Sequence, residues 1–340
     1  MTDRTAQRIA FKNSTLWQEA SAVAMAGDAS GRRYHRLFDP STERSAILMD
    51  APPEAGEDVR PFLRVAAYLR DLGLSAPEIF AADQDQGFLI LEDFGENRYD
   101  RICADHPDHE PALYDAAVDV LLTLSQAEPL EDLTDFRPDM TEAAMPCYDW
   151  YAAPVTGDLA KEGRAETADL LRRLIDSLGP QTVTALRDYH AQNLLWLPER
   201  QNAARVGVLD FQDAVLCHPA YDLISLTTDA RRDVSDDIAD RCLQRMTDGL
   251  QVDAEKFARD AAICSVQRNL RILMIFARMS LHFARPHYLD LLPRVWRYLQ
   301  RDLDHPDLRP LAIRIRAIKS IDTGNSSTFS LDPQPTAEED

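Results

Sequence analysis

The first part of the chain alternates between short apolar runs and polar turns. Residues 2–19 have helical spacing, and helical spacing of apolar side chains returns from Val59 to Leu69, before Gly73 ends that segment. Four other runs have the length and composition of β-strands: residues 21–26, 32–38, 45–50 and 87–91. The pattern predicts a small antiparallel sheet with a helix packed on it.

Beyond residue 92 the apolar spacing is mostly helical. The helical patterns cover residues 111–127, 159–178, 266–281 and 306–319. We therefore predict an α+β fold with two lobes, a small sheet lobe over residues 1–92 and a mostly helical lobe over residues 93–319. Residues 320–340 have the polar, Ser-, Thr- and Pro-containing composition of a disordered tail.

Two short apolar runs, 194–197 and 206–209, interrupt the helical part. Asp188 and Asn193 form a D-x-x-x-x-N loop before the first run, and Asp210 follows the second. A hairpin of these two runs would bring the three oxygen-bearing side chains to one point. Phosphoryl transfer needs such a group, because it depends on positioning and charge neutralisation. Asp188 would accept the proton of the acceptor hydroxyl, and Asn193 and Asp210 would ligate magnesium.

The alternative is an ordinary turn. Asp and Asn are common in turns, and a D-x-x-x-x-N match often occurs by chance. The context favours the catalytic interpretation, because a second strand ends at Asp210 and Asp222 follows in the first turn of a predicted helix. Asp222 would support the site structurally, or only favour the N-terminus of its own helix.

The segments LRDYHAQNLLWL, VGVLDFQDA and HPAYDLISL resemble the catalytic, metal-binding and following helical segments of the aminoglycoside phosphotransferase and choline kinase group. More narrowly, GDASGRRYHRL, LMDAPPE, LGLSAPEIFAAD, GFLILEDFG and QRNLRILMIFARM resemble the anomeric sugar kinases of bacterial peptidoglycan recycling. Those enzymes phosphorylate N-acetylmuramate and N-acetylglucosamine at the C1 hydroxyl. The resemblance runs from about Ala24 to Arg285. It implies a bilobal protein-kinase-like fold, ATP as co-substrate, Mg²⁺ as cofactor and an amino-sugar acceptor.

The resemblance also implies further site residues. The crossing between the lobes would offer main-chain groups of Glu92 and Phe94 to adenine. Gln212 stands where some relatives have a metal-associated acid, so its contact with magnesium would be weaker or water-mediated. His190 would contact the acceptor sugar, or simply pack in the loop.

The sequence departs from the kinase pattern in two places. The third strand lacks the phosphate-gripping lysine and has Leu48 and Met49 instead, and Leu186 replaces a histidine of the catalytic loop. The polar turn carrying Ser30 would cap phosphates with its amides, or be a plain hairpin turn.

Arginines after that turn offer a replacement for the lysine. Arg32, Arg33 and Arg36 follow it at once, and a guanidinium makes bidentate phosphate contacts. We predict that one of them, with Arg32 and Arg33 as the candidates, reaches phosphate.

A second group of arginines lies on the helical segment 266–281. Arg268, Arg271 and Arg278 fall near one another, away from the apolar stripe. The lactyl carboxylate of N-acetylmuramate needs a local cation in so acidic a chain, which makes Arg268 and Arg271 candidates for substrate binding. Internal salt bridges are an equal alternative.

Composition limits the partners. The formal charge of 37 − 57 = −20 argues against nucleic-acid binding, which depends on Lys and Arg. Five scattered cysteines without a C-x-x-C pair indicate reduced thiols in a cytoplasmic protein. The longest apolar run, 272–277, is too short to span a membrane, and the N-terminus has no apolar signal core. No segment indicates an obligate protein partner.

The leading hypothesis is thus an ATP- and Mg²⁺-dependent sugar 1-kinase acting on N-acetylmuramate, N-acetylglucosamine or both. One alternative is a kinase of aminoglycosides or aminoalcohols, although the arginine row would repel such cations. The other is a catalytically silent nucleotide-binding module, which the missing lysine and Leu186 favour and which the retained Asp188, Asn193 and Asp210 oppose.

Overall fold

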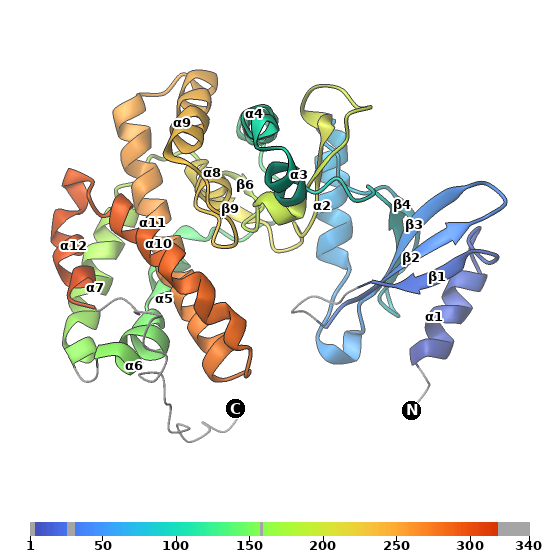
Figure 1. Cartoon of the computed structure of the whole chain (residues 1–340), viewed down its shortest axis with the longest axis horizontal. Helices are drawn as coiled ribbons and strands as arrows, with labels where there is room; N and C mark the ends of the chain where they lie inside the picture. The colour runs from blue at the N-terminus through green and yellow to red at the C-terminus, as the bar shows by residue number, and fades with distance from the viewer. Residues whose placement is uncertain (1–3, 26–30, 157–158, 319–340) are drawn as a thin grey trace. The chain divides into compact units, whose positions relative to one another are not determined.

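The computed structural model describes residues 4–25, 31–156 and 159–318 (Figure 1). The chain forms two compact units, each made of separate segments. The first contains residues 1–123 and 191–214, and the second contains residues 124–190 and 215–340. The lobes predicted from the sequence are continuous segments instead, and their boundary after residue 92 stays a prediction. The predicted tail, 320–340, lies outside the described residues.

The first unit contains a five-stranded antiparallel sheet in the order β1-β2-β3-β5-β4. This confirms the predicted antiparallel sheet, and residues 79–83 add a strand that was not among the predicted ones. Its strands are β1 (Ser21–Ala24), β2 (Arg33–Asp39), β3 (Arg44–Asp50), β4 (Ile79–Asp83) and β5 (Phe88–Glu92), and its helices are α1 (Arg4–Asn13), α2 (Arg60–Asp71), α3 (Tyr99–Asp105) and most of α4 (Glu110–Gln126).

Side chains alternate along each strand, so the two faces of this sheet pack against different parts of the chain. On one face Leu37 and Leu48 pack with Phe11, in the last turns of α1, and with Trp17, just beyond it. Arg4 at the start of α1 is fixed by Asp50, which is buried and accepts from its Nε at 2.8 Å. The opposite face is left for α2 and a pocket.

A short hairpin completes the first unit. It pairs β7 (Leu194–Trp196) with β8 (Val206–Val208), as the sequence predicts. The backbone N–H of Val208 donates to the carbonyl of Ser75 at 2.8 Å, and that of Trp196 donates to Asn97 at 2.7 Å. These bonds hold the hairpin to the segments that precede β4 and α3.

The second unit is mostly helical, which agrees with the predicted α+β class. It contains α5 (Met140–Ala144), α6 (Ala153–Thr156), α7 (Leu159–Asp176), α8 (Ala220–Thr227), α9 (Asp236–Leu250), α10 (Ala254–Leu281), α11 (Leu292–Asp302) and α12 (Arg309–Arg316), with a two-stranded sheet of β6 (Val183–Ala185) and β9 (Val215–Cys217).

Helix α10 is the centre of the second unit. It contacts α5, α7, α8, α9 and α11, and Leu270 and Leu273 are among its buried residues. It begins well before the predicted residue 266, because Asp253 caps it by accepting from the N–H of Lys256 at 2.8 Å. None of the described helices has both the length and the apolar character needed to cross a membrane.

Candidate active site

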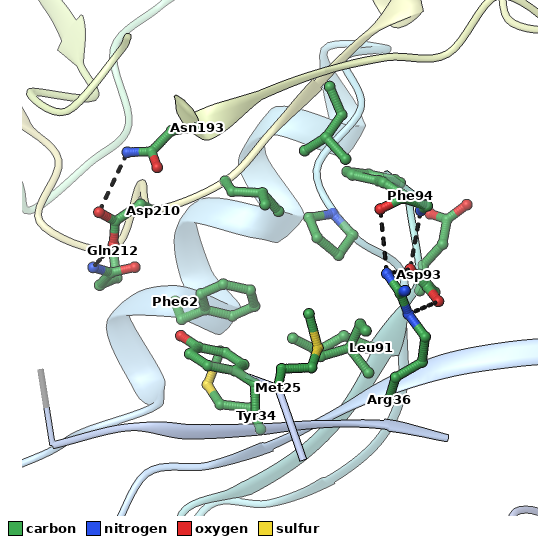
Figure 2. A pocket seen from close by; sticks show the side chains of 17 residues that line it. Met25, Tyr34, Arg36, Phe62, Leu91, Asp93, Phe94, Asn193, Asp210 and Gln212 are labelled. Atoms are coloured by element: carbon green, nitrogen blue, oxygen red, sulfur yellow. Dashed lines mark hydrogen bonds and ion pairs between the residues drawn. The ribbon is translucent and has the colours of Figure 1, made fainter. Parts of the chain in front are cut away.

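A pocket in the first unit lies between the sheet and the β7–β8 hairpin (Figure 2). Its wall is largely apolar, with Tyr34 and Met49 from the sheet, Phe62 from α2 and Leu195 from β7. The ring of Phe62 stacks on that of Phe211 at 4.8 Å between centroids, which ties α2 to the segment after β8. The pocket is therefore largely apolar, and the contact between α2 and the segment after β8 holds its wall in place.

Three polar side chains gather on one side of this pocket, as Figure 2 shows. Asp210 accepts a hydrogen bond from Asn193 Nδ2 at 3.4 Å and another from Gln212 Nε2 at 2.8 Å. The hairpin brings them together, because the N–H of Leu209 donates to the carbonyl of Asn193 at 2.9 Å. Asp210 has a left-handed backbone conformation, with φ of 58°, which non-glycine residues adopt at a cost.

This donor set suits a hard divalent cation. Mg²⁺ is usually held by one or two carboxylates together with neutral oxygens, phosphates and water. Asp210 supplies the carboxylate, and a half-turn of either amide would point its oxygen toward the same place. The described residues contain no cluster of three or more His, Cys, Asp or Glu side chains that would form a complete protein cage. The cluster therefore fits a cation that also binds phosphate.

The crossing after β5 is fixed to the hairpin by side chains. The carboxylate of Glu92 pairs with Arg200, whose guanidinium also donates to Ser75 Oγ at 2.7 Å and lies 5.2 Å from the centre of the Phe94 ring. The ring of Phe94 itself lies against Gly207 of β8. The side chains of Glu92 and Phe94 therefore serve to place the crossing, which leaves the expected contacts with adenine to the main chain.

The arginines after the first turn are placed differently from one another. Arg32 is tied to Glu57 by a 2.7 Å bond, and Arg36 faces the pocket but pairs with Asp93 and Glu96. Tyr34 and Arg36 of β2 line the pocket, and side chains alternate along a strand. The Arg33 side chain therefore leaves β2 on the opposite face of the sheet. Ser30 lies outside the described residues. That an arginine reaches phosphate stays a prediction.

In the second unit, Asp222 holds the loop that carries Asp188. Its carboxylate accepts from the N–H of Leu186 at 2.5 Å and of Arg187 at 2.9 Å. Burial raises the pKa of Asp222 to about 6, and Asp188 acts in the same direction, whereas the two N–H donors and Arg268 oppose it. At neutral pH the carboxylate is therefore ionised and accepts both bonds.

The side chains predicted to bind substrate lie near this loop. His190 is buried, with its ring nitrogen Nε2 at 3.3 Å from Arg231. Arg268 is only 5% exposed and donates to Ser225 Oγ at 2.9 Å, while Arg271 is half-buried one turn further along α10. Sequence reasoning missed Ser225 and Arg231. Ser225 was within reach, because it stands three residues after Asp222 and so shares its helical face.

Asp188 belongs to the second unit, and Asn193 and Asp210 belong to the first. Their convergence around one cation therefore stays a prediction. Each unit nevertheless contains one of the two groups that phosphoryl transfer would need. The first unit has a pocket with a carboxylate and two amides at one side, and the second has the Asp188 carboxylate on a loop that is hydrogen-bonded to Asp222.

A sheet unit with this pocket and a helical unit with this loop are features of a kinase-like phosphotransferase. The model of the phosphotransferase enzyme family matches residues 21–259, and the chain belongs to that family. The fold agrees: a choline/ethanolamine kinase family protein from Mesorhizobium loti superposes with a TM-score of 0.63 over 93% of this chain and 100% of its own, at 14% identity.

Two relatives place the chain more narrowly. It is 35% identical to the N-acetylmuramate/N-acetylglucosamine kinase of Caulobacter vibrioides, over 91% of this chain and 95% of that protein. It is 32% identical to the protein of the same name from Pseudomonas aeruginosa, over 83% of each chain. The resemblance seen in the sequence motifs is thereby confirmed, and the chain is a phosphotransferase enzyme grouped with these sugar kinases.

Proposed function

We propose that this enzyme transfers the γ-phosphoryl group of ATP to the anomeric C1 hydroxyl of N-acetylmuramate, N-acetylglucosamine or both, as a cytoplasmic step in the recycling of cell-wall sugars. The names of its relatives support the choice of sugars. The observation that carries the phosphotransfer chemistry is the cluster of Asp210, Asn193 and Gln212 beside an apolar pocket.

The pocket suits a nucleotide because its two sides differ. The apolar wall with Tyr34, Met49 and Phe62 would take the base, with main-chain groups of Glu92 and Phe94 at its edge. The phosphates would then lie toward the polar cluster described above. A magnesium ion held there would neutralise phosphate charge and keep the reacting groups in line.

The acceptor would meet the loop of the second unit. We assign Asp188 the role of general base that takes the proton from the sugar hydroxyl. The half-buried Arg271 is the better placed of the two predicted arginines to pair with a lactyl carboxylate, because Arg268 is buried. His190, also buried, would act on the sugar only through its neighbours.

A coupled assay of ADP release tests this function. It uses N-acetylmuramate, N-acetylglucosamine, kanamycin and choline as acceptors, with and without magnesium. We expect release with the two amino sugars only, and only with magnesium. The 1-O-methyl glycoside of N-acetylglucosamine is the control for position, because it lacks a free C1 hydroxyl and should be inert.

Two results would overturn the proposal. Release with kanamycin or choline alone would favour an aminoglycoside or aminoalcohol kinase. Thermal stabilisation by nucleotide without release with any acceptor would favour the silent module, for which the apolar Met49 on the pocket face is the specific observation.

A further inference from the structure

The peptide before Asp188 has an unusual conformation that needs support. Arg187 has a φ of 70°, in the left-handed region. For a residue with a Cβ this costs roughly 1–2 kcal/mol, and such a conformation persists only where surrounding contacts enforce it. The direction of the Asp188 side chain follows from this turn, so the contacts that enforce the turn also aim the carboxylate.

Both backbone polar groups of Arg187, its N–H and its carbonyl, are hydrogen-bonded to side chains of α8. Asp222 accepts from the N–H of Arg187, as described above, and Ser225 Oγ donates to the carbonyl of the same residue at 3.0 Å. Asp222 and Ser225 are three residues apart on α8, so one face of one helix supplies both contacts. The Ser225 side chain is fully buried, so water does not compete for this bond.

Arg268 of α10 completes the chain of contacts. Its Nη2 donates to Ser225 Oγ at 2.9 Å, which leaves the serine hydrogen to point at the carbonyl of Arg187. A charged donor strengthens the bond that the hydroxyl then makes. The Ser225 hydroxyl is therefore oriented by Arg268 of α10 on one side and by the carbonyl of Arg187 on the other.

A buried guanidinium is costly, so its position calls for an explanation. Burial lowers the pKa of Arg268, while the charges of Asp188 and Asp229 and the phenol of Tyr221 favour its cation and Arg271 opposes it. The cation thus balances carboxylates around the loop.

We propose that Ser225 and Arg268 are positioning residues for Asp188, acting through the backbone of Arg187 rather than by touching the substrate. This inference rests on the proposed role of Asp188 as general base. It reassigns Arg268, which the sequence suggested as a ligand of the substrate carboxylate, and leaves that role to Arg271.

The test compares Ser225→Ala, Ser225→Thr, Arg268→Gln and Arg268→Lys with the wild-type enzyme. Arg309→Gln is the control for loss of an arginine, because Arg309 is exposed at the start of α12. Turnover, KM for ATP and for the acceptor, the pH profile and the melting temperature are measured for each variant.

We expect Ser225→Ala to lower kcat roughly 10- to 100-fold with little change in either KM, because misplacing a catalytic group by about 1 Å has an effect of that size. Ser225→Thr keeps the hydroxyl and should recover much of the lost turnover. The double variant Ser225→Ala/Arg268→Gln should be no slower than Ser225→Ala alone, because Arg268 acts on the loop through Ser225.

The pH profile separates charge from geometry. The titratable and charged side chains that the described residues place in electrostatic contact with Asp222 include Asp188, Arg268 and Cys217. Arg268→Gln removes a cation that lowers the pKa of Asp222, so loss of activity on the acid side should move to higher pH. Arg268→Lys keeps the charge and should keep the profile while losing turnover through its different shape.

Several results would overturn the inference. A raised KM for the acceptor with unchanged kcat would make Arg268 a substrate ligand. A lower melting temperature with normal kcat would make the chain of contacts purely structural. The comparison is made with whichever acceptor supports ADP release in the wild-type enzyme. A failure of the sugar assignment therefore appears in the wild type, and a failure of this inference appears only in the variants.

Discussion

Gly207 of β8 has no room for a side chain. A methyl group there would lie 2.8 Å from Cδ2 and 3.0 Å from Cε2 of Phe94, and 3.2 Å from Cδ1 of Leu197. Nonbonded carbons prefer about 3.5–4.0 Å, so the Phe94 ring would have to move by roughly 0.5–1 Å. Arg200 lies over the same ring and pairs with Glu92, so the displacement would disturb the crossing that lines the pocket.

We therefore expect Gly207→Ala to lower the free energy of unfolding by about 1–3 kcal/mol, the usual effect of overpacking. Nucleotide affinity should fall as well, since Phe94 lines the pocket. Gly163→Ala is the matched control. Gly163 lies inside α7, and its added methyl group would be in ordinary contact with the Tyr148 side chain, at 3.9 Å. Alanine there should raise stability by about 0.5–1 kcal/mol. Urea unfolding and calorimetric titration with ATP measure both quantities.

A Gly207→Ala protein as stable as the wild type, with unchanged nucleotide affinity, would refute this reasoning. A second variant keeps the test decisive if the first is poorly folded. Phe94→Leu in the Gly207→Ala background shortens the obstructing side chain and should recover part of the lost stability. If the double variant is less stable than Gly207→Ala, the contact with Phe94 is not the cause.

The roles assigned to Asp188, Asp210 and Asp222 each lead to a measurable expectation. Asp188→Asn should lower kcat by about 10²–10⁴-fold with little change in ATP affinity, and a collapse of ATP binding would contradict its assignment as base. Asp210→Asn should raise the magnesium concentration needed for half-maximal activity, and an unchanged requirement would remove Asp210 from the metal site. Activity should fall below about pH 6 as the Asp222 carboxylate becomes protonated. Because this pKa is raised from 3.8 to about 6, the Asp222 contribution to the free energy of unfolding should be larger by about 2 kcal/mol at pH 4 than at pH 7. This contribution should be lost as the pH rises through 6. The difference in stability between the wild-type enzyme and Asp222→Asn across this range measures it.

Periodicity predicted the sheet and the β7–β8 hairpin because both follow from local spacing. The spacing of β2 also places Arg33 on the face opposite Tyr34 and Arg36. This could not be used to exclude Arg33 from the pocket, because the sequence does not show which face of β2 lines the pocket. The burial of Arg268 was beyond sequence reasoning. Helical spacing groups it with Arg271, whereas its environment depends on how α8 packs against α10, a contact between residues 43 positions apart.

Under the proposed function, the side chains of the pocket determine how the charge of a bound nucleotide would be balanced. Arg36 is the only cationic side chain among the described residues that line the pocket, and its guanidinium is already engaged by Asp93 and Glu96. Met49 adds an apolar surface where related kinases would have a lysine. With few side-chain cations available and a net charge of −20, the binding of a polyphosphate would depend mainly on the divalent cation. The carboxylate of Asp210 would then matter more here than in kinases that share the task with a lysine, which is why the magnesium requirement is the most informative property to measure in its variants.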